Sequence, residues 1–149
     1  MSYEQLKLSN QICFPMYAAS RLITREYQPH LDELGITYPQ YLVLMVLWET
    51  DGISVNEIAG KLILNTNTVT PLLKRLESQG LIDRQRSGND ERKVFVTLTE
   101  KGRQLRIEAA SIPAKLVSGL VESDIDLEKL SNLKEQLYVL INFLSKKEP

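Results

Sequence analysis

The residues best suited to chemistry are one cysteine, Cys13, and three tyrosines that follow it in the chain: Tyr17, Tyr27 and Tyr38. The thiolate is the nucleophilic form of cysteine, and phenolic hydroxyls that donate hydrogen bonds to it stabilise it over the thiol. A thiolate flanked by apolar side chains such as Ile12 and Phe14 could attack an organic hydroperoxide and become a sulfenic acid. No second cysteine is present to resolve it, so a low-molecular-weight thiol, a backbone nitrogen or further oxidation would have to follow.

An isolated cysteine on an apolar helix can also be a small buried hydrophobe with no chemistry. Pro15 lies two residues beyond Cys13, and a proline past the first turn of a helix kinks it. Either the helix bends near Cys13, or a new helical segment begins there. The second arrangement would leave unpaired backbone N–H groups beside the sulfur, which favour a negative charge.

A second group of residues lies in the segment TNTVTPLLKRLESQG, whose apolar side chains predict one buried helix face. Hydroxyls and amides at its N-terminal end, followed by cations, suit a helix that enters the major groove of DNA. A solvated amphipathic helix is the alternative. The candidate DNA-binding residues of this helix are Thr66, Asn67, Thr68, Thr70, Pro71, Lys74 and Arg75.

The polar stretch SGNDER is flanked by two expected strands at 81–84 and 93–98, and Phe95 in the second strand is expected to lie in the core. Arg92 could enter a narrow minor groove with Asp90 holding its guanidinium, and Arg84 adds a further candidate DNA contact. An exposed turn with a weak ion pair would have the same sequence. Residues 74–106 carry nine basic and five acidic side chains, whereas the rest of the chain has an acidic surplus. This asymmetry indicates one electropositive face.

These candidates need a scaffold, and the helix signals predict one. Thr37 with Pro39 marks a helix start, Ser54 with Glu57 forms a capping-box pattern, and Gly80 ends a helix. Two short helices followed by a hairpin predict a winged helix-turn-helix. Thr99 should cap a long helix interrupted near residues 118–119. The last helix carries leucines three and four residues apart, a seam for a partner helix: Leu130, Leu133, Leu137, Leu140 and Leu144.

The composition is that of one globular domain of 149 residues, with 43% hydrophobic residues and a net charge of −1. The lone cysteine fits a reducing cytoplasm, and the N-terminus has no signal-peptide pattern. The longest apolar run, residues 41–48, is too short to span a membrane. We therefore expect a cytoplasmic protein of the mainly α class with a small β-hairpin, without a metal, a cofactor or a membrane partner.

The blocks ITYPQY, TPLLKRLESQGLIDRQRS, DER and LTEKG, in this order, resemble the MarR-type winged-helix repressors. Within that family, QICFPMYAAS with Tyr27 is similar to the one-cysteine organic hydroperoxide-resistance repressors. The resemblance implies a homodimer that binds a pseudo-palindromic operator in double-stranded DNA. It implies dimerisation helices at 5–34 and 99–147, a DNA-binding lobe at 35–98, and a sensing thiol at Cys13 that is hydrogen-bonded by Tyr27 and Tyr38 of the partner subunit.

The sequence departs from the family pattern at the entry to the recognition helix. The usual Asp-Ser-Gly-Thr is here residues 65–68, Asn-Thr-Asn-Thr, so Asn67 adds a side chain where glycine is usual. Three alternatives to the peroxide-sensing repressor remain open: a repressor released by a reversibly bound small aromatic ligand with Cys13 incidental, a thiol peroxidase, and a helical interaction module. The absence of a resolving cysteine argues against the peroxidase, so we expect no enzyme.

Overall fold

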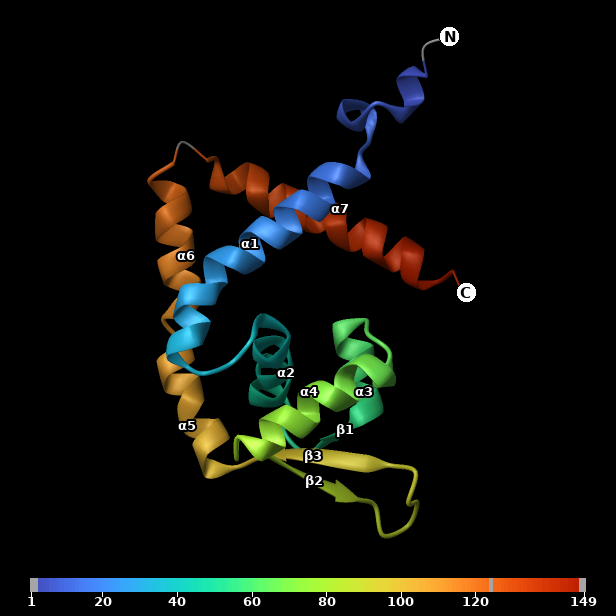
Figure 1. The fold of residues 1–149 in the computed structure, drawn as a ribbon, viewed down its shortest axis with the longest axis vertical. Coiled ribbons are helices and arrows are strands. Elements are labelled where there is room, and N and C mark those ends of the chain that lie inside the picture. The colour runs from blue at the N-terminus through green and yellow to red at the C-terminus, as the bar shows by residue number, and fades with distance from the viewer. Residues whose placement is uncertain (1–2, 124, 148–149) are drawn as a thin grey trace.

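The computed structural model describes residues 3–123 and 125–147 (Figure 1). Two short 3₁₀ turns precede the first long helix, and a compact helical lobe with a small sheet lies in the middle of the chain. Three further helices complete the fold. The elements are η1 (Glu4–Leu6), η2 (Leu8–Asn10), α1 (Cys13–Glu33), α2 (Tyr38–Glu49), β1 (Ile53–Ser54), α3 (Val55–Leu62), α4 (Thr66–Ser78), β2 (Ile82–Arg86), β3 (Val94–Leu98), α5 (Glu100–Ala109), α6 (Ile112–Val121) and α7 (Leu127–Ser145).

The predicted helix starts are confirmed by their hydrogen bonds. The Thr37 hydroxyl accepts from the backbone N–H of Gln40, whose side-chain oxygen accepts from the N–H of Thr37 at 2.8 Å. Ser54 and Glu57 form the same reciprocal box at the start of α3. Gly80 follows the end of α4 with φ of 72°, a left-handed conformation that favours glycine. These residues mark the start of α2, the start of α3 and the end of α4.

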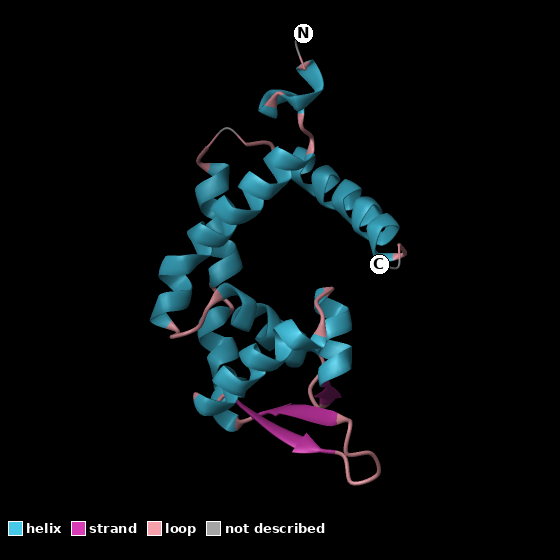
Figure 2. Ribbon diagram, turned by 45° about the vertical axis from the view of Figure 1, so that its right-hand side comes forward, coloured by secondary structure: helices cyan, strands magenta, loops and turns pink. Residues whose placement is uncertain are grey.

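The strands form an antiparallel sheet in the order β1-β3-β2, and β2 and β3 make a wing directly after α4 (Figure 2). The winged helix-turn-helix expected from the sequence is therefore confirmed. The short strand β1, in which Ile53 pairs with Val96, was not predicted. Two residues are too few to show the alternating pattern by which strands are recognised.

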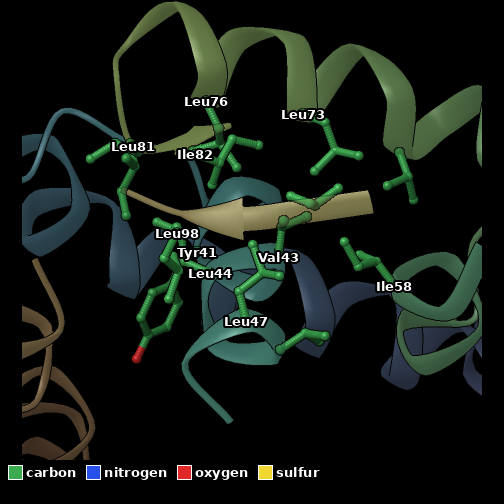
Figure 3. Packing of buried hydrophobic residues seen from close by; sticks show 14 of the residues in the cluster. Tyr41, Val43, Leu44, Leu47, Ile58, Leu73, Leu76, Leu81, Ile82 and Leu98 are labelled. Atoms are coloured by element: carbon green, nitrogen blue, oxygen red, sulfur yellow. The ribbon is translucent and has the colours of Figure 1, made fainter. Parts of the chain in front are cut away.

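One hydrophobic core joins the sheet to the helices of the lobe. Leu73 and Leu76 point from α4 into the same cluster as Val43, Leu44 and Leu47 of α2 (Figure 3). All five side chains are at most 1% exposed, so the predicted apolar faces of these helices are buried. Burying such a side chain contributes about 1.5–3 kcal/mol. Helix α4 is thus held on the lobe by its inner face, which leaves its other faces to solvent.

The first long helix begins at Cys13, so the new helical segment, rather than a bend, is the outcome near Pro15. Ile12 is the N-cap residue, and no side chain caps the helix. The prediction for the helix after Thr99 was wrong in one respect. The interruption lies at residues 110–111, between α5 and α6, and α6 continues through residues 118–119. Pro113 stands in the first turn of α6, where a proline suits a helix start.

A close contact joins α5 to the lobe. A Cβ added to Gly102 would lie 2.0 Å from the backbone oxygen of Leu81, so α5 and the start of the wing touch through backbone atoms. The indole N–H of Trp48 donates to the carbonyl oxygen of Gly102 at 2.9 Å. The carboxylate of Asp51 accepts a hydrogen bond from the backbone N–H of Leu98 at 2.8 Å. Its other oxygen forms an ion pair with the guanidinium of Arg103 at 3.3 Å. These contacts set the angle at which α5 leaves the wing.

None of the helices in the described part of the chain is long and apolar enough to cross a membrane.

Candidate functional site

A groove of about 590 Å³ lies between the start of α3, the outer side of α4 and the wing strands. Thr66 and Thr70 of α4 line it on one side, and Arg84 and Arg92 line it on the other. These four predicted DNA-binding residues come from three separate stretches of sequence. The structure brings them to one surface, as an interface with a nucleic-acid backbone requires.

The groove is predominantly cationic. Arg92 and Lys93 form no ion pair with any residue in the described ranges 3–123 and 125–147, so their charges are available to phosphates. One carboxylate, that of Glu57, also lines the groove. The backbone N–H and the hydroxyl of Ser54 donate to this carboxylate and lower the pKa of Glu57. The capping box of α3 therefore keeps Glu57 ionised at the edge of the groove, with its carboxylate hydrogen-bonded to Ser54.

Two of the three candidate threonine hydroxyls on α4 already have partners close by in the chain. The hydroxyl of Thr68 donates to the side-chain oxygen of Asn65 at 3.0 Å, and that of Thr70 donates to the backbone oxygen of Thr66 at 2.7 Å. Asn65 also accepts from the N–H of Thr68 at 2.9 Å and is the N-cap of α4. In this arrangement both hydroxyls have lone pairs left to accept hydrogen bonds from base amino groups.

The other candidates on α4 are exposed, and no hydrogen bond engages the side chain of Asn67 within the described residues. Asn67 lies in the first turn, the part of a recognition helix that meets base edges. The remaining exposed candidates on this helix are Thr66, Pro71, Lys74 and Arg75. A free amide in the first turn with cations further along matches the arrangement predicted from the sequence.

The expected contact between the Asp90 carboxylate and the Arg92 guanidinium in the wing is not formed. The carboxylate of Asp90 accepts from the backbone N–H of Arg92 at 3.0 Å, and the two side chains form no ion pair. Asp90 thus shapes the loop, while the guanidinium of Arg92 is left exposed. Arg84 is engaged elsewhere, because it donates to Glu77 through Nε at 3.0 Å and Nη2 at 2.6 Å.

One lining residue was misplaced by sequence reasoning. We expected Phe95 in the core, but it is 37% exposed and lines the groove. Its neighbours Val96 and Leu98 are buried, whereas Thr97 is exposed. Side chains alternate between the faces of a strand, so with Val96 inside, Phe95 must lie outside. The same alternation was readable in the sequence.

The candidate thiol lies far from this groove, at the first residue of α1. Cys13 is exposed, and its apolar neighbours Ile12 and Phe14 are 75% and 41% exposed. Tyr17, one helical turn away, is 62% exposed and has the guanidinium of Arg21 4.8 Å above its ring. The thiol and its apolar neighbours in the sequence are therefore all exposed in the single chain.

Tyr27 and Tyr38 lie together but not beside Cys13. Their ring centroids are 4.9 Å apart, and Tyr41 and Trp48 extend the cluster toward α5 with ring spacings of 5.9–6.3 Å. Burial, followed by the nearby Tyr27, raises the pKa of Tyr38, so its hydroxyl keeps its proton and can donate at neutral pH. Tyr27 is 14 residues from Cys13 on α1, which is about 21 Å along the helix. Within one chain, neither phenol of the Tyr27–Tyr38 pair can reach the thiol.

Comparisons with known proteins decide between the classes that this geometry allows. The family described as "Transcriptional regulator SarA/Rot" matches residues 25–108. The organic hydroperoxide resistance transcriptional regulator of Bacillus subtilis (strain 168) is 46% identical over 145 residues, covering 97% of each chain. The chain belongs to the MarR/SarA family of transcriptional regulators. Reduced AbfR of Staphylococcus epidermidis bound to DNA is a similar solved structure, with 37% identity, a TM-score of 0.77 and coverage of 97% and 99%.

AbfR has also been solved in a disulfide form, with 38% identity, a TM-score of 0.64 and coverage of 97% of this chain and 96% of that one. The family predicted from the ordered motifs is thus confirmed for this MarR/SarA regulator. The helical interaction module is excluded as a description of the chain, because its relatives are transcriptional regulators. The individual DNA-binding and thiol-binding residues stay predictions.

Asn67 provides a test of sequence readout in this MarR/SarA regulator. A side-chain amide in the first turn of α4 can bond adenine with two hydrogen bonds, worth about 1–3 kcal/mol of discrimination. We expect Asn67→Gly to lower the preference for one base pair in each half-site by about tenfold, while binding to other positions is unchanged. Competition binding with operators varied one base pair at a time measures this. An unchanged base preference in Asn67→Gly would contradict the assignment.

Proposed function

We propose that this chain is a homodimeric repressor that binds a pseudo-palindromic operator and releases it when an organic hydroperoxide oxidises Cys13, which derepresses a peroxide-detoxification gene. The observation that carries the proposal is the pairing of an exposed lone thiol with a cationic winged-helix groove in one regulator fold. Its relatives include a regulator of organic hydroperoxide resistance and a DNA-bound regulator solved in reduced and overoxidised forms.

The terminal helices support the dimer. Helix α7 has 19 residues, and none of its described side chains is buried. In both views it lies apart from the winged lobe (Figure 2). An isolated helix whose apolar stripe is in water is marginally stable, so α7 needs a partner. Its exposed apolar residues fit a second copy of residues 5–34 and 99–147, and are Leu127, Leu133, Tyr138, Val139, Phe143 and Leu144.

The second copy would also complete the thiol site. Tyr17 lies one helical turn from Cys13, whereas Tyr27, whose ring packs against Tyr38 of α2, lies about 21 Å from Cys13 along α1. A twofold interface that brings the start of α1 to the partner's α2 supplies the phenols, with Tyr17 completing the site from the same chain. The apolar side chains of Ile12, Phe14 and Met16 would then be enclosed. Such walls favour an alkyl or lipid hydroperoxide over hydrogen peroxide.

The chemistry uses only the thiol and two small molecules. The thiolate attacks the distal oxygen of ROOH, which keeps its proton, and the O–O bond breaks, which gives Cys13 sulfenic acid. The alkoxide that leaves takes a proton from water and becomes the alcohol ROH. A low-molecular-weight thiol then displaces water from the sulfenic acid and forms a mixed disulfide. With one cysteine in each chain, this disulfide must involve sulfur from outside the chain or from the second copy. The reaction is stoichiometric, as for a sensor rather than an enzyme.

Oxidation acts on DNA binding through geometry. The two recognition helices of a dimer must enter major grooves about 34–36 Å apart. A mixed disulfide at the start of α1 adds bulk at the dimer interface and removes the tyrosine bonds, which shifts the lobes relative to one another. The groove residues of α4 and the wing then fail to meet both half-sites together. A regulator that acts on the chromosome in this way works in the cytoplasm.

A gel shift on the promoter of the protein's own operon tests this function. The reduced protein should form a specific complex that survives a scrambled competitor and dissociates after cumene hydroperoxide with a low-molecular-weight thiol. Intact mass spectrometry should show one thiol adduct per chain. A complex that forms equally on scrambled DNA, or that persists after complete modification of Cys13, would contradict the proposal.

The tyrosine pair offers a test of the thiol site that leaves the DNA interface untouched. We expect Tyr27→Phe and Tyr38→Phe each to slow oxidation of Cys13 by about tenfold or more, since a hydrogen bond to a charged acceptor is worth about 1.5–3 kcal/mol. Both variants should bind the operator like the wild type when reduced. Stopped-flow measurement of thiol loss gives the rates. Tyr3→Phe, at an exposed tyrosine of the N-terminal segment, is the control, and equal slowing in all three variants would refute the assignment.

A further inference from the structure

The wing and the recognition helix are joined by an ion pair. Both Nε and Nη2 of Arg84 donate to the same carboxylate oxygen of Glu77, at 3.0 and 2.6 Å. The Arg84 side chain is 21% exposed and that of Glu77 is 38% exposed, so solvent screens the pair only partly. Charge-assisted bonds of this length are stronger than the average surface ion pair.

The pair crosses from one DNA-reading element to the other. Glu77 lies in the last turn of α4, and Arg84 is the third residue of β2. The backbone between them turns sharply at Gly80. Leu76 and Ile82 attach α4 and β2 to the core on the buried side of this turn. On the groove side, Arg84 with Glu77 is the one ion pair of the described residues that bridges α4 and the sheet.

We infer that Glu77 and Arg84 are positioning residues that fix the wing against the recognition helix, and that Arg84 acts through Glu77 rather than by contacting DNA. This inference rests on the proposed DNA binding. The charge of Arg84 is compensated by Glu77, so Arg84 releases few counterions when DNA binds, unlike Arg92, which forms no ion pair in the described part of the chain. Base hydrogen bonds require donor–acceptor distances of about 2.7–3.2 Å, so a small rotation of the wing loses specific contacts while phosphate attraction persists.

The test is a set of charge variants measured against operator and scrambled duplexes over a range of salt concentrations. Glu77→Gln keeps the shape of the side chain and removes its charge, and Arg84→Gln removes the other partner. The reversed pair E77R/R84E restores an ion pair with exchanged ends. Glu91→Gln is the matched control, because Glu91 is exposed in the wing loop and forms no ion pair in the described part of the chain.

We expect Glu77→Gln and Arg84→Gln each to lower operator affinity by about fivefold, as for a partly buried pair, with scrambled-DNA affinity and the salt slope unchanged. The double variant E77Q/R84Q should lose no more than either single variant, and the reversed pair should recover part of the affinity. Glu91→Gln should instead bind slightly more tightly, because it removes a negative charge near phosphates.

The opposite pattern identifies Arg84 as a direct phosphate contact. In that case Arg84→Gln lowers the salt slope by about one, and Glu77→Gln raises affinity by freeing the guanidinium. Either result, or no change in any variant, overturns the inference. Thermal unfolding of each variant confirms that it folds. Failure of the wild type itself to prefer the operator would refute the proposed DNA binding instead, so the two outcomes are separate.

Discussion

Cys13→Ser is expected to bind the operator as tightly as the reduced wild type and to stay bound when organic hydroperoxide is added. Serine has nearly the shape of cysteine, and the residue is exposed at the start of α1, so the fold should not change. Its hydroxyl has no oxidation chemistry with peroxides. For the wild type, a shift from mostly bound to mostly released requires a difference in affinity of about 10⁴ between the two forms. The Cys13→Ser variant should show no difference in operator affinity before and after hydroperoxide.

Fluorescence anisotropy of labelled operator DNA, titrated with protein before and after cumene hydroperoxide, measures this difference. The Cys13→Ser variant also separates the alternative triggers. A repressor released by a reversibly bound aromatic ligand would keep its response in the variant. A thiol peroxidase would consume many equivalents of hydroperoxide per wild-type chain when a reductant is supplied. Release of the Cys13→Ser variant by hydroperoxide would show that Cys13 is not the sensor.

Gly102→Ala is expected to destabilise the fold by about 3 kcal/mol. The added Cβ would lie 2.0 Å from the backbone oxygen of Leu81 and 3.2 Å from the side chain of Leu98. Because the first of these is backbone, no side-chain rotation relieves the clash, and α5 must move away from the wing. The favourable helix propensity of alanine, about 1 kcal/mol over glycine, offsets only part of this cost. For a chain of this length, the midpoint of thermal unfolding should fall by about 10 °C.

Gly60→Ala is the matched control. Gly60 also lies in a helix, α3, but a Cβ there meets nothing within 4 Å, so the substitution should stabilise the protein by about 0.4–1 kcal/mol. The fluorescence of Trp48 reports the contact directly, since its indole N–H bonds to the Gly102 carbonyl and the sequence has no other tryptophan. Unfolding must be compared at equal protein concentration, because a dimer gains stability with concentration. Equal stability of the two variants would contradict the proposed clash.

Interactions between residues close together in the chain were enough to predict the individual helices and the wing. Caps such as Thr37 with Gln40 and Ser54 with Glu57 join residues three apart, so their hydrogen bonds depend on little beyond the neighbouring chain. The buried faces of α2 and α4 follow from the helical period, and the β2–β3 wing follows from a change to the strand period. The ordered motifs along these elements were sufficient to predict the regulator family that the comparisons confirm.

The way these elements meet depends on the packing of the whole fold, which local patterns do not show. The gathering of Thr70, Arg84 and Arg92 around one groove depends on the packing of α4 on the sheet. The engagement of Arg84 by Glu77 is equally a matter of packing, since seven residues and a sharp turn separate them along the chain. The break between α5 and α6 was misplaced because Ser118 and Gly119 are tolerated inside a helix, whereas the true boundary lies beside Pro113.

The separation of Cys13 from Tyr27 and Tyr38 was likewise beyond local reasoning. Residue spacing suggested a thiol with phenols nearby, but helix α1 places Tyr27 about 21 Å from Cys13 along its axis, and Tyr38 packs against Tyr27. Period and capping are set by neighbours within one or two turns, and they specify which face a side chain takes. Distances between faces depend on how whole elements pack, and that information is spread over contacts distant in sequence.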